Sequence, residues 1–178
     1  MNTERLRLSM QRAIGFEIAV CELLNRRSQP HQVKKFFVVI SWLGDGKAWY
    51  CLMFVLPLMY GEGGFATAWS MAKIGVVNLL IYKLTKQLTG RQRPCAVSAN
   101  IDLGIAPLDQ YSFPSGHTMH AVAFSMIATA HHPELTFLVV PFSTLVALSR
   151  IVLGLHYPTD VIAGGVIGGY IAFLLLSF

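Results

Sequence analysis

Charged side chains are scarce in this sequence. They make up 13% of its 178 residues, whereas hydrophobic residues make up 54%, and the mean hydropathy is +0.54. Soluble globular domains carry about 25% charged residues, so this composition excludes an ordinary soluble domain. We therefore expect an integral membrane protein.

Cysteine is also rare. Cys21, Cys51 and Cys95 form an odd and scattered set, so we expect no disulfide framework. The sequence has no internal repeat, no dinucleotide-binding loop and no nucleic-acid motif, and its N-terminus does not fit a cleavable signal peptide. The net charge of +5 is accordingly assigned to a membrane-facing surface, and no nucleic-acid partner is expected.

Long apolar runs supply the architecture. With their polar flanks, five of them approach the roughly 20 residues that a bilayer core requires: Ala48–Tyr60, Phe65–Tyr82, Thr118–Ala130, Leu135–Leu148 and Val161–Phe178. The sequence thus predicts an all-α membrane protein, a bundle of five transmembrane helices. Six spans are the alternative, depending on how the N-terminus is placed.

The N-terminal segment reads as surface helices. Met10–Leu24 has apolar residues at helical spacing, but Glu17 and Glu22 interrupt it, which suits an interfacial helix better than a span. Val33–Leu43 resembles a second short amphipathic piece. We therefore divide the chain into an interfacial segment, residues 1–44, and a transmembrane domain, residues 45–178.

Positive charge is nearly absent from the second half of the chain. All but one of the 14 Lys and Arg residues lie in residues 1–93, and the exception is Arg150. If the five spans are followed in order, three polar stretches fall on one membrane face: residues 83–93, 114–117 and 149–158. These stretches can therefore meet.

Two of the stretches precede helices. Pro114, Ser115 and Gly116 form a turn whose free backbone N–H groups can bind an anion, with His117 in the first helical turn, although an ordinary helix cap would look the same. His156 and Asp160 are four residues apart, so the carboxylate can orient the imidazole as a nucleophile or base. A hydrogen-bonded helix cap is the simpler interpretation of that pair alone.

The remaining cations have simple explanations when taken singly. Lys86, Arg91 and Arg93 could hold anionic lipid headgroups, and Arg150 could favour a helix C-terminus. The combined order of residues is more specific. It follows the three-part pattern K-x6-R-P, P-S-G-H and S-R-x5-H-x3-D at Lys86, Arg93, Pro94, Pro114, Ser115, Gly116, His117, Ser149, Arg150, His156 and Asp160.

This pattern resembles the type-2 phosphatidic acid phosphatase family, in the superfamily that includes vanadium haloperoxidases. The resemblance implies that His156 attacks phosphorus to form a phosphohistidine and that Asp160 fixes its tautomer. It implies that His117 protonates the leaving oxygen and later activates water. The phosphate oxygens would be bound by Lys86, Arg93, Ser115, Gly116 and Arg150. Neither a metal ion nor another cofactor is expected.

The resemblance implies a bacterial cytoplasmic-membrane enzyme that acts on a lipid phosphate or diphosphate, most like undecaprenyl diphosphate phosphatases. Phosphatidylglycerophosphate, phosphatidate or lipid A phosphatases, and a lipid phosphotransferase with the same site, are alternatives. A non-catalytic anionic-lipid binding protein is the alternative of another class. The positive-inside rule would place the site in the cytoplasm, whereas the family implies the periplasmic side, which we follow. The sequence leaves the oligomeric state open.

Overall fold

A computed structural model describes residues 2–177, and it is helical almost throughout. Two short helical turns, η1 (Leu43–Lys47) and η2 (Pro133–Leu135), join longer helices. The α-helices are α1 (Asn2–Arg27), α2 (His31–Trp42), α3 (Ala48–Thr89), α4 (Pro94–Val97), α5 (Gly116–His131), α6 (Thr136–Val152) and α7 (Pro158–Ser177). The all-α prediction is confirmed.

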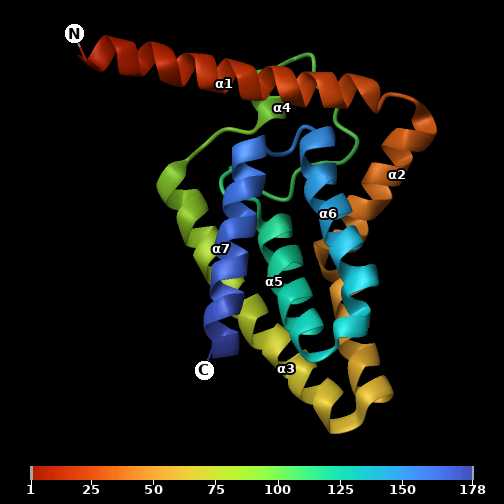
Figure 1. Ribbon diagram of the computed structural model, residues 1–178. Coiled ribbons are helices and arrows are strands. Elements are labelled where there is room, and N and C mark those ends of the chain that lie inside the picture. Colours follow the sequence, from red (N-terminus) through yellow and green to blue (C-terminus); the bar gives the residue numbers. More distant parts are fainter. Residues whose placement is uncertain (1, 178) are drawn as a thin grey trace.

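The bundle forms around α5, which lies among α3, α6 and α7 (Figure 1). The long helix α3 is folded back on itself at Gly61, whose backbone has φ 57° and ψ −130°, a conformation that glycine adopts without steric cost. Residues 48–60 therefore form a first arm. Residues 62–89 form a second arm, which returns toward the end of the bundle where the first arm begins. The return places Lys86, in the last turn of α3, at the same end as the start of α5 (Figure 1).

Small residues let α7 lie directly against α5. A Cβ atom added to Gly164 or Gly168 would collide with the backbone carbonyl of Ser115 or Met119. Small residues at four-residue spacing allow helix backbones to approach this closely. Ser115 N–H also donates to the carbonyl of Asp160 at 3.0 Å, so the first turns of the two helices are fixed to each other.

Among residues 2–177, three helical stretches are long and apolar enough to cross a membrane: His31–Thr89, Pro133–Val152 and Pro158–Ser177. The first contains α2 and both arms of α3. The central helix α5 has 16 residues, fewer than the roughly 20 of a typical span. The chain is therefore an integral membrane protein by its helices, and the count of five spans stays a prediction.

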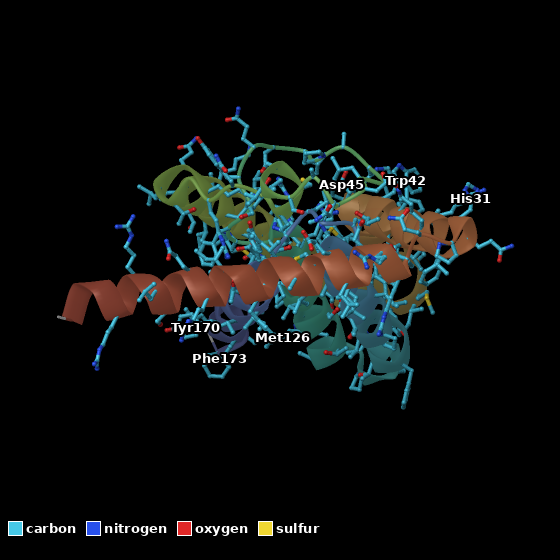
Figure 2. The ribbon with its side chains drawn as sticks, turned by 90° about the horizontal axis from the view of Figure 1, so that it is seen from above. His31, Trp42, Asp45, Met126, Tyr170 and Phe173 are labelled. Carbon is cyan, nitrogen blue, oxygen red and sulfur yellow. The ribbon has the colours of Figure 1, made fainter. Side chains whose placement is uncertain are left out.

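The N-terminal helices differ from each other in direction. α1 lies across one end of the bundle, and the view from above shows it crossing that end (Figures 1 and 2). α2, which overlaps the short piece expected at Val33–Leu43, instead runs through η1 into the first arm of α3 and packs on α6. The division of the chain at residue 44 stays a prediction.

Candidate active site

The three sequence motifs meet at the end of the bundle that α1 crosses (Figure 1). A cavity of about 420 Å³ lies there, and the expected site residues that line it are Lys86, Arg93, Gly116, His117, Arg150 and His156. Ser115 precedes Gly116 in the chain, and Asp160 lies behind His156. The structure thus gathers side chains that the sequence carries in three separate stretches.

Three buried cations form one wall of the site. Lys86, Arg93 and Arg150 have only 6%, 3% and 3% of their surface exposed. Lys86 and Arg93 converge on the carboxylate of Asp109: Lys86 Nζ lies 2.8 and 2.7 Å from its two oxygens, and Arg93 Nη2 lies 2.7 Å from Oδ1. Arg150 donates to the hydroxyl of Ser41. Cations held this close together are suited to bind the several oxygens of a phosphate.

His156 sits in the connection between α6 and α7, almost fully buried at 1% exposure. Its Nε2 lies 3.2 Å from Arg93 Nη1, toward the cavity. Burial, and then the charges of Arg150, Arg93 and Lys86, lower the pKa of His156 well below its ordinary value. The imidazole is therefore neutral at pH 7, which is the form that can attack phosphorus.

Asp160 stands behind His156 in the first turn of α7. Its Oδ2 is 3.7 Å from His156 Nδ1 and accepts a hydrogen bond from Tyr157 N–H at 2.9 Å. Its Oδ1 accepts from Arg91 Nη1 at 2.6 Å. Within residues 2–177, His156 Nδ1 is buried and has no hydrogen-bond partner, and Asp160 is placed to accept a hydrogen bond from it on a small approach of the two groups.

The start of α5 supplies the opposite wall. Ser115 is the N-cap of this helix: its Oγ accepts from Thr118 N–H at 3.5 Å and lies 3.0 Å from Thr118 Oγ1. Gly116 and His117 follow it and line the cavity. His117 Nε2 lies 3.6 Å from Asp45 Oδ1, where the backbone of η1 is kinked. The helix-cap interpretation therefore describes the Ser115 hydroxyl in this structure.

The arrangement has the chemistry of a phosphoryl-transfer site, because a neutral buried imidazole, a second imidazole and three cations line one cavity. A sequence profile described as the PAP2 superfamily matches residues 64–178. The chain belongs to this superfamily. The family resemblance read from the three motifs is confirmed.

Named relatives of this PAP2 chain act on lipids. It is 28% identical over 166 residues to a lipid A 1-phosphatase of Rhizobium etli, covering 82% of this chain and 71% of the relative. It is 26% identical over 163 residues to an undecaprenyl-diphosphatase of Sulfolobus acidocaldarius, covering 90% of this chain and 77% of the relative.

The fold likewise matches a solved structure, a transmembrane PAP2-type phosphatidylglycerolphosphate phosphatase of Bacillus subtilis. The TM-score is 0.73 at 24% identity, and the match covers 93% of this chain and 85% of that one. These comparisons confirm the predictions of a membrane-embedded fold and of a phosphatase that acts on lipids.

Several residues of the PAP2 site were not predicted from sequence. Asp109 and Asp45 are carboxylates that face the cations and His117, and Ser41 contacts Arg150. One signal was available for Asp109, because Asp102 and Asp109 are the only acidic residues between positions 63 and 133. No local pattern points to Ser41, since its role depends on α2 packing against α6.

His120 is a structural residue. Its Nδ1 lies 2.8 Å from the carbonyl of Gly116, and its Nε2 lies 3.2 Å from the carbonyl of Gly75. The ring thus bridges α5 to the second arm of α3 and helps to pack the two helices together.

Proposed function

We propose that this PAP2 protein removes the terminal phosphate of a lipid phosphate or diphosphate, with undecaprenyl diphosphate as its best substrate, through a phosphohistidine at His156. One observation carries the proposal. The cavity that holds the three cations and both histidines continues into an apolar region, where it is lined by Trp49, Met53, Met71, Val76, Leu79 and Phe124. A ligand that fills it therefore has an anionic head and an apolar tail.

The lining supports a separate position for each part of such a ligand. Residues of the first arm of α3, of its second arm and of α5 surround the apolar region, and both arms of α3 belong to a stretch long and apolar enough to cross a membrane. The cations lie at the end of those helices, where Lys86 and Arg150 occupy last turns. A lipid can thus keep its chain among the helices while its phosphate reaches His156.

The first chemical step is attack by His156 Nε2 on the terminal phosphorus. The new N–P bond forms as the bond from phosphorus to the leaving oxygen breaks. His117, which takes up a proton when the anionic lipid phosphate binds, gives that proton to the leaving oxygen. Lys86, Arg93, Arg150 and the Gly116 N–H stabilise the charge on the equatorial oxygens. Asp160 accepts the hydrogen bond from Nδ1–H and stabilises the positive charge that develops on the ring.

The second step is hydrolysis of the phosphohistidine. His117, now neutral, removes a proton from a water molecule, and the resulting oxygen attacks phosphorus. The N–P bond breaks, inorganic phosphate leaves, and His156 is neutral again. Three fixed side-chain cations take up the charge in both steps, so we expect turnover without an added metal ion.

The size of the cavity favours a single-chain lipid. At about 420 Å³ it has the volume of a small-molecule site, which suits a diphosphate with the first part of one isoprenoid chain. Lipid A, which carries several acyl chains, is the second candidate, and the 28% identity to a lipid A 1-phosphatase supports it. Phosphatidylglycerophosphate, phosphatidate and transfer of the phosphoryl group to another lipid would use the same residues.

We place the protein in the bacterial cytoplasmic membrane with the site facing outward. This orientation is the one that the family resemblance implies, since family members hydrolyse lipid diphosphates on the outer side of the membrane. The positive-inside rule taken alone argues for the opposite face.

The decisive test is phosphate release by the purified protein in detergent with EDTA present, from a panel of lipid phosphates and diphosphates. We expect release from undecaprenyl diphosphate to be fastest, and His156→Ala to lower it by at least roughly 1000-fold because the attacking atom is lost. His131→Ala is the matched control, since His131 is exposed at the far end of α5. Full activity of His156→Ala would refute the phosphohistidine.

The same assay separates the alternatives. A lipid phosphotransferase would move labelled phosphate to an acceptor lipid and release little of it. A non-catalytic lipid-binding protein would bind the panel and release none. If another lipid of the panel were hydrolysed fastest, that lipid would take the place of undecaprenyl diphosphate as the proposed substrate.

A further inference from the structure

A polar stripe on α1 faces the connection from α6 to α7 that carries His156, which we call the catalytic loop. Glu17, Cys21 and Asn25 are four residues apart, so they lie on one face of the helix. All three are buried, with 9%, 0% and 1% exposure. Burial of polar side chains on one face of an otherwise exposed helix indicates specific partners rather than contact with solvent.

Each residue of the stripe contacts the segment that carries His156. Asn25 Nδ2 donates to the carbonyl of Val152 at 3.0 Å. Cys21 Sγ lies 3.7 Å from the carbonyl of His156. Glu17 Oε1 accepts from Thr159 N–H at 3.0 Å. The connection from α6 to α7 is therefore held along its length by α1, which crosses directly over it in Figure 1.

An ion-pair chain extends from the same stripe to the acid behind His156. Arg91 Nη2 donates to Glu17 Oε2 at 2.6 Å, and Arg91 Nη1 donates to Asp160 Oδ1 at 2.6 Å. The guanidinium also lies 4.0 Å from the centre of the Tyr157 ring. The planar guanidinium thus has fixed contacts on two edges and one face.

These contacts leave Asp160 a single orientation. Arg91 holds its Oδ1 and the Tyr157 N–H holds its Oδ2, so the plane of the carboxylate is fixed and Oδ2 faces His156 Nδ1. Asp160 has no exposed surface. A buried carboxylate without a cation is costly to ionise. Arg91 therefore controls both the direction and the charge of the group that His156 depends on.

We propose that Glu17 and Arg91 are positioning residues for catalysis, through which α1 holds Asp160 and the loop bearing His156 in reactive geometry. The inference rests on the proposed role of His156 as the nucleophile. It assigns to the N-terminal helix a part in turnover, in addition to its place across the end of the bundle.

Kinetics of the full-length protein test this role. Arg91→Met should lower kcat by about 10- to 100-fold, because hydrogen bonds of a charged group to Asp160 are lost. Glu17→Gln, which keeps the shape of the side chain, should lower kcat by about threefold to tenfold. The KM should stay within about twofold in both, since neither residue lines the cavity. Arg91→Lys should recover part of the lost kcat.

Glu22→Gln is the matched control on the same helix. The Glu22 carboxylate accepts from Ser98 and Asn100, away from the catalytic loop. We expect it to leave kcat at the wild-type value. If it lowered kcat as much as Glu17→Gln does, general weakening of α1 would explain the effect and the positioning role would be wrong.

The pH profile adds a readout that a merely structural role would not move. Asp160 is faced by Arg91, by His156 and Tyr157, and by Glu17 and Cys21 of α1. Without the Arg91 cation its carboxylate binds a proton more readily. The acidic limb of the kcat profile should then move to higher pH in Arg91→Met, and back toward the wild-type position in Arg91→Lys.

The outcomes separate this inference from the proposed function. If His156→Ala keeps its activity, the nucleophile assignment fails whatever the other variants do. If His156→Ala is inactive while Glu17→Gln and Arg91→Met keep wild-type kcat and an unmoved acidic limb, the positioning role alone fails. Should Arg91→Met not fold, as judged by its melting temperature, Glu17→Gln decides: reduced kcat at an unchanged melting temperature supports the role, and unchanged kcat overturns it.

Discussion

Asp109 occupies the position among the cations that a phosphate would need. Its two oxygens lie within 2.8 Å of Lys86 Nζ, and Arg93 Nη2 and Nε donate to its carboxylate and its backbone carbonyl. Burial alone would raise the pKa of Asp109, but the hydrogen bonds and charges of Lys86 and Arg93 outweigh burial and hold this pKa below its usual range. The carboxylate is therefore ionised at neutral pH and competes with an anionic substrate.

We predict that Asp109→Asn strengthens anion binding. Vanadate mimics the five-coordinate phosphorus of the transition state. Removing the competing charge should lower the inhibition constant of vanadate by roughly tenfold and should also lower KM. Competition assays with the purified variant measure both. Asp102→Asn is the control, because Asp102 lies in the same loop but pairs with Lys34, away from the site. Weaker vanadate binding in Asp109→Asn would mean instead that this carboxylate organises the cations.

At the scale of helices, the site depends on how closely α7 approaches α5. The first turn of α7 carries Asp160, and the first turn of α5 carries Gly116 and His117. The contact is made through Gly164 and Gly168, where α7 meets backbone atoms of α5. Both of these parts of the candidate site are therefore positioned by one glycine-lined contact.

We predict that Gly168→Ala separates these helices. Its Cβ would collide with the carbonyl of Met119, and overpacking of this kind costs about 1–3 kcal/mol. The neighbouring Gly169→Ala is the matched control, because its Cβ would meet only ordinary contacts of 3.5 Å with Met126 and 3.6 Å with Val122. Thermal unfolding in detergent should show a lower melting temperature and lower activity for Gly168→Ala only. Equal melting temperatures for the two variants would contradict the close-contact explanation.

At the scale of the whole molecule, α1 and the connection from α6 to α7 lie at one end (Figure 1), and the cations line the cavity there. The orientation of this end in the membrane decides which pool of lipid phosphate the enzyme reaches. Cys95 reports on it, since it lies in α4 next to the site, its N–H bonded to the Gly154 carbonyl at 3.1 Å. Cys21 is buried on the face of α1 that contacts the carbonyl of His156, and Cys51 lies on the first arm of α3.

We predict that a membrane-impermeant maleimide labels Cys95 in cells whose outer envelope is permeabilised and whose inner membrane is intact. Burial raises the pKa of the Cys95 thiol, so labelling needs alkaline pH to produce enough thiolate. Cys95→Ser protein is the control and should lose the label. Labelling that requires lysis of the inner membrane would place the site in the cytoplasm, as the positive-inside rule alone suggests.

Most residues that line the candidate site were predictable, because they belong to motifs of fixed residue type and spacing. His156 and Asp160 are one helical turn apart, and Pro114 to His117 form a local turn, so neighbours in sequence are neighbours in space. Ser115 shows the limit of such reasoning. A short motif that caps a helix and one that binds phosphate look alike in sequence. In the structure the Ser115 hydroxyl contacts the hydroxyl and the N–H of Thr118.

The sequence by itself determined the membrane class, the helical runs and the motifs that mark the family, since hydropathy and short-range spacing are local properties of the chain. Only the tertiary structure decided which charges meet. Arg91 pairs with Glu17, 74 residues away, and with Asp160, 69 residues away in the other direction. Asp109 reaches Lys86 from 23 residues away. These partners are chosen by helix packing and by the cost of leaving a buried charge unpaired, which no local pattern encodes.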